Sequence, residues 1–239
     1  MTFIGITAGG NDRARLRLRS SLLSPRPLQV GAARARVALV ATSALLLGGD
    51  NVSIGIDVGL GCRLEVVDIA GTVAYDARDA VSTWTVNITV ADGGRLFWKA
   101  EPFVIAGGSN VCRRTTLDLA AGAQACLRET LVLGRTGEQG GAVRARTRVS
   151  LDGQPLLAED LDLADPAARN RPGILGGYRV IDTASVFGRR AATPVNARCF
   201  QLAGEGTVAR YLGGDLHRSA IPEAYGSWRN ELSSEWAAD

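Results

Sequence analysis

Residues 44–61 read ALLLGGDNVSIGIDVGLG, one alternating segment that lies between two glycine turns. Apolar residues occupy every second position from Val52 to Val58, and small or polar residues occupy the positions between them. Successive side chains of a β-strand point to opposite faces, so this alternation is typical of a strand with one buried face. The stretch therefore predicts a half-buried strand that a tight turn bounds at each end.

The same unit of a glycine turn and an apolar strand recurs along the chain at intervals of about 30 residues. Further units begin at Gly61, Gly94, Gly122 and Gly153. Each unit has room for a strand, a turn and a second strand. The repeat predicts an all-β fold in which stacked β-hairpin units form a β-helix-like architecture, with short helices at the C-terminal end.

Three other segments predict departures from this pattern. The sequence Ser24–Pro27 contains two prolines and predicts a break between paired strands, because proline has no backbone N–H to donate. Asp165–Gly177 predicts a long loop that could serve as a lid or hinge. Thr207–Leu212 predicts a short helical turn.

The C-terminal end of the chain has helical periodicity. Its apolar residues lie three or four positions apart and would share one face of a helix: Ile221, Tyr225, Trp228, Leu232 and Trp236. Ser219 is suited to cap that helix, with Pro222 in the first turn. Two interpretations of the apolar face remain open, because it would either pack on the protein's own sheet or bind a partner.

These patterns predict two parts. We expect residues 1–203 to form a β-solenoid-like scaffold domain and residues 204–239 to form a C-terminal helical segment that packs on it or on a partner. A chain of 239 residues is long enough to bury a core without staples.

Composition argues against several functions. The 27 basic residues are scattered among 24 acidic ones, without a basic block that aromatic residues interrupt, so we expect no nucleic acid partner. The most apolar segment, Val37–Leu47, is too short to span a membrane, and no signal peptide is evident, so we expect a cytoplasmic protein. No two of the four cysteines have C-x-x-C spacing, and His217 is the single histidine. A zinc site and a histidine-based catalytic triad are therefore not indicated.

Carboxylates remain as the candidate functional residues. The four that we select are Asp50 after a Gly-Gly turn, Glu101 before Pro102, Glu129 inside an apolar strand, and Glu138 in the following turn. Stacked units could bring several of these acids into one line, and oxygen ligands suit the transient passage of a hard or borderline divalent cation. The alternative is that each acid simply lies at the surface or in a turn.

Three segments in this order resemble the urease accessory protein D family, which is also called H. They are VALVATSALLLGGDNVSI (37–54), LFWKAEPFVIAGG (96–108) and ACLRETLVLGRTGE (125–138), and the later DGQPLLAEDLDL (152–163) agrees as well. The resemblance is close over Arg36–Asp162 and looser elsewhere. Asp50 matches the acid of the family's Gly-Gly-Asp turn, Glu101 its Trp-x-x-Glu-Pro segment and Glu129 the acid before its Leu-Gly-Arg turn. Glu138 is a looser match.

The resemblance implies a non-enzymatic scaffold with a β-helix-like stack and C-terminal helices. It further implies partners, namely apo-urease, accessory protein F and the GTPase accessory protein G, and a role in delivering nickel to the urease active site. No tightly bound cofactor is implied, only transient nickel in a water-filled tunnel. The stripe Tyr225, Trp228, Leu232 and Trp236 would then be a candidate docking site for accessory protein F.

Two other functions stay open from the residues alone. One is a carboxylate-pair glycan hydrolase that uses Asp50 and Glu129, which requires both acids in one cleft. The other is a purely structural β-scaffold with no role in metal transfer.

Overall fold

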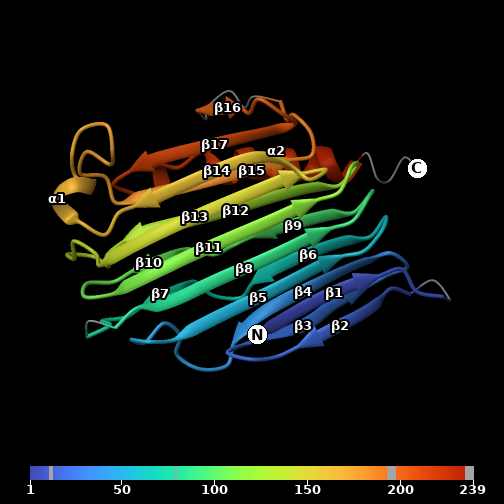
Figure 1. The fold of residues 1–239 in the computed structure, drawn as a ribbon, viewed down its shortest axis with the longest axis horizontal. Helices are drawn as coiled ribbons and strands as arrows, with labels where there is room; N and C mark the ends of the chain where they lie inside the picture. The colour runs from blue at the N-terminus through green and yellow to red at the C-terminus, as the bar shows by residue number, and fades with distance from the viewer. Residues whose placement is uncertain (11–12, 79, 193–197, 235–239) are drawn as a thin grey trace.

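Two β-sheets packed face to face form the body of the molecule (Figure 1). The computed structural model describes residues 1–10, 13–78, 80–192 and 198–234. Within these residues, sheet A has seven strands in the spatial order β14 (Gln154–Asp162), β13 (Ala142–Leu151), β11 (Asn110–Leu119), β8 (Ser82–Val90), β5 (Asn51–Val58), β1 (Thr2–Thr7) and β2 (Arg15–Arg19).

Sheet B has ten strands among the described residues. Their main order is β16 (Cys199–Gln201), β17 (Gly206–Gly213), β15 (Val180–Phe187), β12 (Gln124–Leu133), β9 (Arg95–Lys99), β6 (Arg63–Asp68), β4 (Arg34–Ala41) and β3 (Leu23–Val30). Two short strands lie off this path. β10 (Phe103–Ile105) pairs with β12, and β7 (Thr72–Ala74) pairs with β10. The helices are α1 (Pro166–Arg169), the 3₁₀ turn η1 (Leu216–Arg218) and α2 (Ile221–Ser234).

The chain alternates between the two sheets as a β-solenoid of about four turns. Strands β5, β8, β11 and β13 run parallel in sheet A, and β4, β6, β9 and β12 run parallel in sheet B. The predicted all-β, β-helix-like fold is thereby confirmed. In detail, the two strands of one unit face each other across the core and do not pair as a hairpin, because each turn carries the chain to the opposite sheet.

The repeat seen in the sequence comes from stacked turns. Gly61, Gly93 and Gly122 have positive φ angles of 59°, 63° and 74°, a conformation that glycine adopts without a steric cost. A Cβ atom on Gly122 would lie 2.4 Å from Asp92 Oδ1 in the turn beneath. The spacing of these glycines along the sequence therefore corresponds to the number of residues in one turn of the solenoid.

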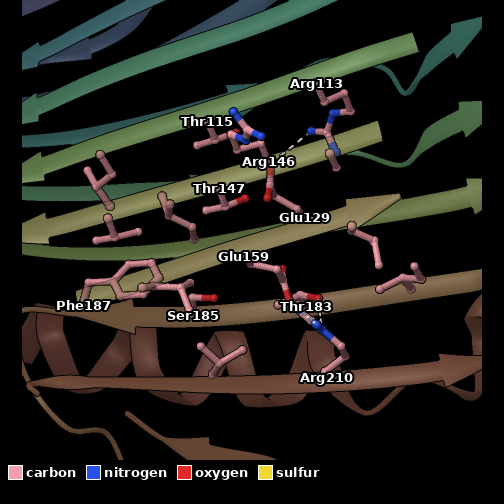
Figure 2. A pocket seen from close by; sticks show the side chains of 18 of the residues that line it. Arg113, Thr115, Glu129, Arg146, Thr147, Glu159, Thr183, Ser185, Phe187 and Arg210 are labelled. Atoms are coloured by element: carbon pink, nitrogen blue, oxygen red, sulfur yellow. Dashed lines mark hydrogen bonds and ion pairs between the residues drawn. The ribbon is translucent and has the colours of Figure 1, made fainter. Parts of the chain in front are cut away.

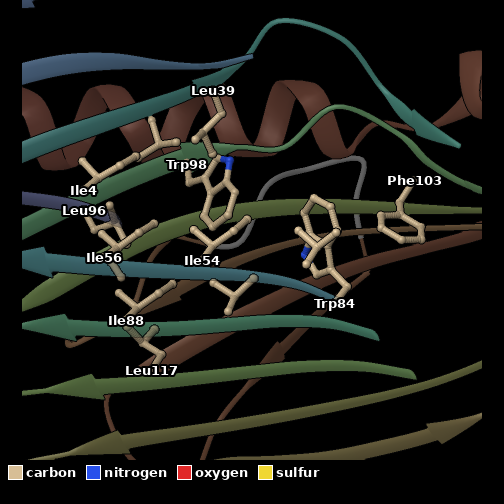
Figure 3. Packing of buried hydrophobic residues seen from close by; sticks show 14 of the residues in the cluster. Ile4, Leu39, Ile54, Ile56, Trp84, Ile88, Leu96, Trp98, Phe103 and Leu117 are labelled. Atoms are coloured by element: carbon tan, nitrogen blue, oxygen red, sulfur yellow. The ribbon is translucent and has the colours of Figure 1, made fainter. Parts of the chain in front are cut away.

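The core lies between the sheets and consists of inward-facing residues from both (Figure 3). Ile54 and Ile56 on β5, Ile88 on β8 and Leu96 on β9 are almost completely buried. The parallel register places Ile54 beside Val86 and Ile56 beside Ile88, so apolar residues form continuous ladders. Burial of these ladders is the main stabilising contribution to the fold.

Two predictions about local structure are wrong. Pro25 and Pro27 lie within β3, paired opposite Leu39 and Val37 of β4, although a break was expected there. β3 is an edge strand, where a residue without an N–H is tolerated, and the register shifts between Pro27 and Gln29.

The predicted helical turn at Thr207–Leu212 is instead β17, which pairs antiparallel with β15. Thr207, Val208 and Ala209 are buried between the solenoid core and helix α2. This tertiary packing favours a strand and overrides the helical pattern of the local sequence. The strand content of sheet B thus extends to Gly213, and the helical part begins at η1. The sequence also predicts a strand over residues 195–202. β16 (Cys199–Gln201) lies within that range, and residues 193–197 lie outside the described residues.

Helix α2 covers the outer face of sheet B. Its apolar stripe of Ile221, Tyr225, Trp228 and Leu232 is at most 5% exposed and packs on Phe97, Cys126, Ala184, Val186 and Ala209. Ser219 Oγ accepts the backbone N–H of Ile221 at 3.2 Å, as expected for its predicted role as a cap. Tyr225, Trp228 and Leu232 therefore pack on the protein's own sheet, as the first of the two interpretations has it. Trp236 lies outside the described residues.

The segment predicted as a lid or hinge is anchored. Asp165 caps α1 by accepting the N–H of Ala167 at 2.8 Å. Arg169 is 2% exposed and donates to four backbone carbonyls, those of Gln139, Gly140, Gly141 and Leu163. A buried guanidinium that is bonded in this way fixes the segment to the neighbouring turn. In the described part of the chain, no helix combines the length and the apolar character that crossing a membrane requires.

Candidate functional site

Three neighbouring cavities lie between and beside the sheets. The first, of about 320 Å³, is lined by residues of β11 to β15 and of β17, together with Phe200 of β16 (Figure 2). The second is about 30 Å³, room for about one water molecule, and it shares Arg113, Thr115, Leu127 and Glu129 with the first. The third is about 270 Å³ and shares Asp68, Thr72 and Trp84 with the second.

The first and second cavities share lining residues, and so do the second and third, so the three cavities lie next to one another. We call this series the passage. It begins near the edge strands β14 and β16, where exposed Phe200 lines the first cavity. It ends beside the loops that follow β4 and β6, where exposed Ile69 lines the third cavity. The middle cavity has the smallest volume of the three.

Four carboxylates line the passage, and each belongs to a different strand or strand end. In order from the first cavity to the third, they are Glu159, Glu129, Glu101 and Asp68. Glu129 borders the first and second cavities, and Asp68 borders the second and third. A cation moving along the passage would thus meet carboxylate oxygens in each cavity.

Glu129 is held by an arginine from the opposite sheet. Arg113 Nη2 on β11 lies 3.0 Å from Glu129 Oε1 on β12, with the arginine side chain 10% exposed and the glutamate side chain 37% exposed. The guanidinium carbon of Arg113 also lies 4.6 Å from the ring centroid of Phe103, a cation–π contact. This ion pair therefore crosses the space between the sheets beside the smallest cavity.

Glu159 is held in the same manner at the outer end. Arg210 on β17 donates to both of its oxygens, at 2.6 and 2.9 Å, and also to Thr183 Oγ1 at 3.2 Å (Figure 2). This bidentate pair joins the edge of sheet A to sheet B.

Asp68 is the most buried acid of the passage. Its Oδ1 accepts from Trp98 Nε1 at 2.9 Å, and its Oδ2 accepts from the backbone N–H of Glu101 at 3.2 Å. Burial raises the pKa of Asp68 to about 6, although both hydrogen bonds oppose that shift. Glu101 itself faces Lys99 at 3.8 Å.

The structure brings together two of the four acids selected from the sequence. Glu101 and Glu129 both line the second cavity, whereas Asp50 and Glu138 line none of the three cavities. Asp50 Oδ2 accepts the N–H of Leu47 at 3.0 Å within its own turn. Because Asp50 and Glu129 do not share a cleft, the carboxylate pair that a glycan hydrolase would need does not form.

Glu138 joins two neighbouring turns. It accepts the side-chain Nε of Arg135 at 2.9 Å and the backbone N–H groups of Arg135 and Gly107, each at 3.0 Å. The Arg135 side chain, followed by these backbone groups, lowers the pKa of Glu138 to about 2. Its oxygens are occupied by the turn, so a structural role explains this residue.

Sequence reasoning missed Asp68, Glu159 and Arg113. Each occupies an inward position of an alternating strand, in the series Leu64-Val66-Asp68, Leu157-Glu159-Leu161 and Val111-Arg113-Thr115. A charged residue at a position that alternation assigns to the core must be paired or must border a cavity. That signal was present in the sequence.

The acids are spread along the passage and do not converge. Among the described residues, no group of three or more histidine, cysteine, aspartate or glutamate side chains could hold a metal ion. A resident divalent cation usually has several protein ligands at once. Separated acids instead suit brief, weak contacts with a mobile cation.

Comparison with known proteins relates the sequence to one protein family. The sequence matches the UreD urease accessory protein family over residues 6–235. Urease accessory protein UreD 1 of Streptomyces griseus is 46% identical over 205 residues, which cover 86% of this chain and 80% of the relative. Urease accessory protein UreD of Streptomyces coelicolor is 37% identical over 209 residues, covering 84% and 81%. Its counterpart from Streptomyces avermitilis is 34% identical over 199 residues, covering 80% and 77%.

Proposed function

Because the chain belongs to the UreD urease accessory protein family, we propose that its acid-lined passage conducts nickel during urease maturation. Proteins of this family are non-catalytic scaffolds that take part in assembly of the nickel metallocentre. The observation that carries the proposal is the series of three cavities with carboxylates in each, Glu159, Glu129, Glu101 and Asp68.

The chemistry of the lining suits this cargo. A divalent cation that enters a narrow protein cavity loses part of its hydration shell, and this loss is costly unless other oxygens replace the water. Carboxylates and the hydroxyls of Thr115, Thr147 and Thr183 supply such oxygens along the first two cavities. Nickel remains transient because no single point offers it a complete ligand set.

The partners follow from the family. We propose that the chain acts in the cytoplasm in a complex with apo-urease, accessory protein F and the GTPase accessory protein G. The two ends of the passage would then face a nickel donor and the urease. Since Tyr225, Trp228 and Leu232 are buried in the protein's own core, any contact of α2 with accessory protein F would use its exposed residues, such as Ser227 and Asn230.

Activation of urease in cells tests this role. The double variant Asp68→Asn/Glu129→Gln removes two charges from the passage and keeps the size of both side chains. We expect the complex with apo-urease to assemble while nickel-dependent urease activity falls by about tenfold or more. Asp57→Asn is the matched control, since Asp57 is a half-exposed carboxylate on the outer face of sheet A.

Two outcomes would separate the candidate functions. Normal urease activity in the double variant, with the complex intact, would contradict the conducting role and favour a purely structural scaffold. Loss of activity together with loss of the complex would point to misassembly, which co-purification with apo-urease detects directly.

A further inference from the structure

Arg113 and Arg128 are the two arginines that line the second and smallest cavity, and Arg128 is already bound to Asp182 through two nitrogens. Arg113 lines both the first and second cavities, and it is 9% exposed. Its Nη2 binds Glu129, while its guanidinium stacks on Phe103. Arg113 also acts at a distance on Asp68, the acid across the second cavity, because its charge opposes the rise in the pKa of that carboxyl.

The hydrogen bonding of Arg113 is incomplete. Its Nε–H is buried and has no hydrogen-bond partner among the described residues. A buried guanidinium ordinarily uses most of its five donors, and Arg128 and Arg210 each bind a carboxylate with two nitrogens. Arg113 therefore holds Glu129 through one nitrogen only, the arrangement from which an arginine is most readily displaced.

We propose that Arg113 is a built-in competitor of the cargo cation, which occupies Glu129 between transits and prevents this acid from trapping the ion. The inference rests on the conducting role proposed above. A cation reaching Glu129 must displace the guanidinium and then lie close to it. Both effects weaken binding at this point, since like charges repel more strongly in a low-dielectric cavity than in water.

Competition by Arg113 also explains how the second cavity can contain Glu129 without binding the cation permanently. An unpaired Glu129 beside Asp68 and Glu101 would present a local excess of negative charge to a divalent cation. With Arg113 in place, that charge is partly neutralised until the ion arrives. Arg113 returns to Glu129 after the ion leaves, while Phe103 keeps the guanidinium nearby.

Equilibrium dialysis of the purified full-length chain against nickel chloride tests this inference. Arg113→Gln should bind Ni²⁺ about tenfold more tightly than the wild-type chain, because the energy of one charge-assisted hydrogen bond no longer opposes binding. The double variant Arg113→Gln/Glu129→Gln should lose this gain. Arg113→Lys keeps the positive charge and should stay close to wild type. Arg17→Gln, which breaks the exposed pair with Asp57, is the matched control and should change nothing.

Wild-type affinity in a folded Arg113→Gln variant, with folding established by circular dichroism, would overturn the inference. Should that variant not fold, single variants of the acids decide the question. Glu129→Gln should lower Ni²⁺ affinity only slightly, because Arg113 already occupies this acid and its positive charge stays beside the ion in both proteins, whereas Asp68→Asn should lower the affinity more. Equal losses of Ni²⁺ affinity in Glu129→Gln and Asp68→Asn would also overturn the inference. Failure of this inference can be distinguished from failure of the conducting role. Urease activation in cells tests the conducting role, whereas Ni²⁺ binding by the isolated chain tests only the competition by Arg113.

Discussion

At the scale of single residues, the acids of this protein have different environments that determine different roles. Glu138 lies in a turn where three donors stabilise its charged form, whereas Asp68 lies in the passage where burial disfavours the charge. The two carboxyl groups therefore titrate far apart, near 2 and near 6. Of these two groups, Asp68 is the one whose charge changes closer to physiological pH.

The raised pKa of Asp68 predicts a dependence of stability on pH. Between about pH 4 and 6 the folded state retains a proton that the unfolded state has released, so the free energy of unfolding falls as pH rises through this range. The contribution of Asp68 changes by at most roughly 3 kcal/mol across that window and is constant above it. Asp68→Asn should remove this change.

Urea denaturation of the wild type and of Asp68→Asn at about pH 4.5 and about pH 7 measures this change in the free energy of unfolding. The prediction would be contradicted if the free energies of unfolding of wild type and Asp68→Asn differed by the same amount at both pH values.

Ni²⁺ binding should also weaken in the wild-type chain as pH falls below about 6, because Asp68 then becomes neutral.

At the scale of elements, one buried network attaches α2 to the solenoid. Asp182 on β15 is 0% exposed and accepts from Arg128 at 3.0 Å through each of its oxygens, from Thr130 at 2.8 Å and from Ser219 at 2.6 Å. Ser219 also caps the first turn of α2. The same hydroxyl thus begins the helix and binds it to strands β12 and β15.

Removal of this hydroxyl should loosen the attachment of the helix. Ser219→Ala loses both the cap and one hydrogen bond to a buried carboxylate, so we expect the free energy of unfolding to fall by about 1–3 kcal/mol. Ser227→Ala, on the exposed face of α2, is the control and should change stability by less than about 0.5 kcal/mol. Chemical denaturation measures both, and equal stabilities would show that the network does not hold the helix.

At the scale of the whole molecule, the space between the two sheets contains both a packed core and the first cavity. Ladders of isoleucine, valine and leucine fill the core, while the ion pairs Arg113–Glu129 and Arg210–Glu159 join the two sheets beside the cavity. A solenoid core therefore also forms the wall of a passage.

Filling the first cavity should block transfer without altering any charge. Ala145 lies on the inner face of β13 and lines this cavity, so Ala145→Phe would occupy part of its 320 Å³. We expect the variant to fold, because a void accepts the ring, and urease activation in cells to fall. Ala158→Phe, at an exposed position of β14, is the control. Full activation in folded Ala145→Phe would show that the first cavity is not on the route.

The sequence by itself determined the all-β class, the solenoid repeat, the position of α2 and the family resemblance, because these depend on local periodicity and on turn glycines such as Gly61 and Gly122. Of the four acids that it proposed, Glu101 and Glu129 line the same cavity. Local pattern failed at β3 and β17, where the position of a strand in its sheet overrode the prolines of one and the helical pattern of the other.

Only the tertiary structure decided which acids meet. Asp68, Glu129 and Glu159 come from strands far apart in the chain, and their distances depend on the register of parallel strands and on the separation of the sheets. The same holds for Arg113, whose pairing with Glu129 needs both sheets in place. Alternation tells which side chains face inward, but the space between two sheets exists only once they have packed.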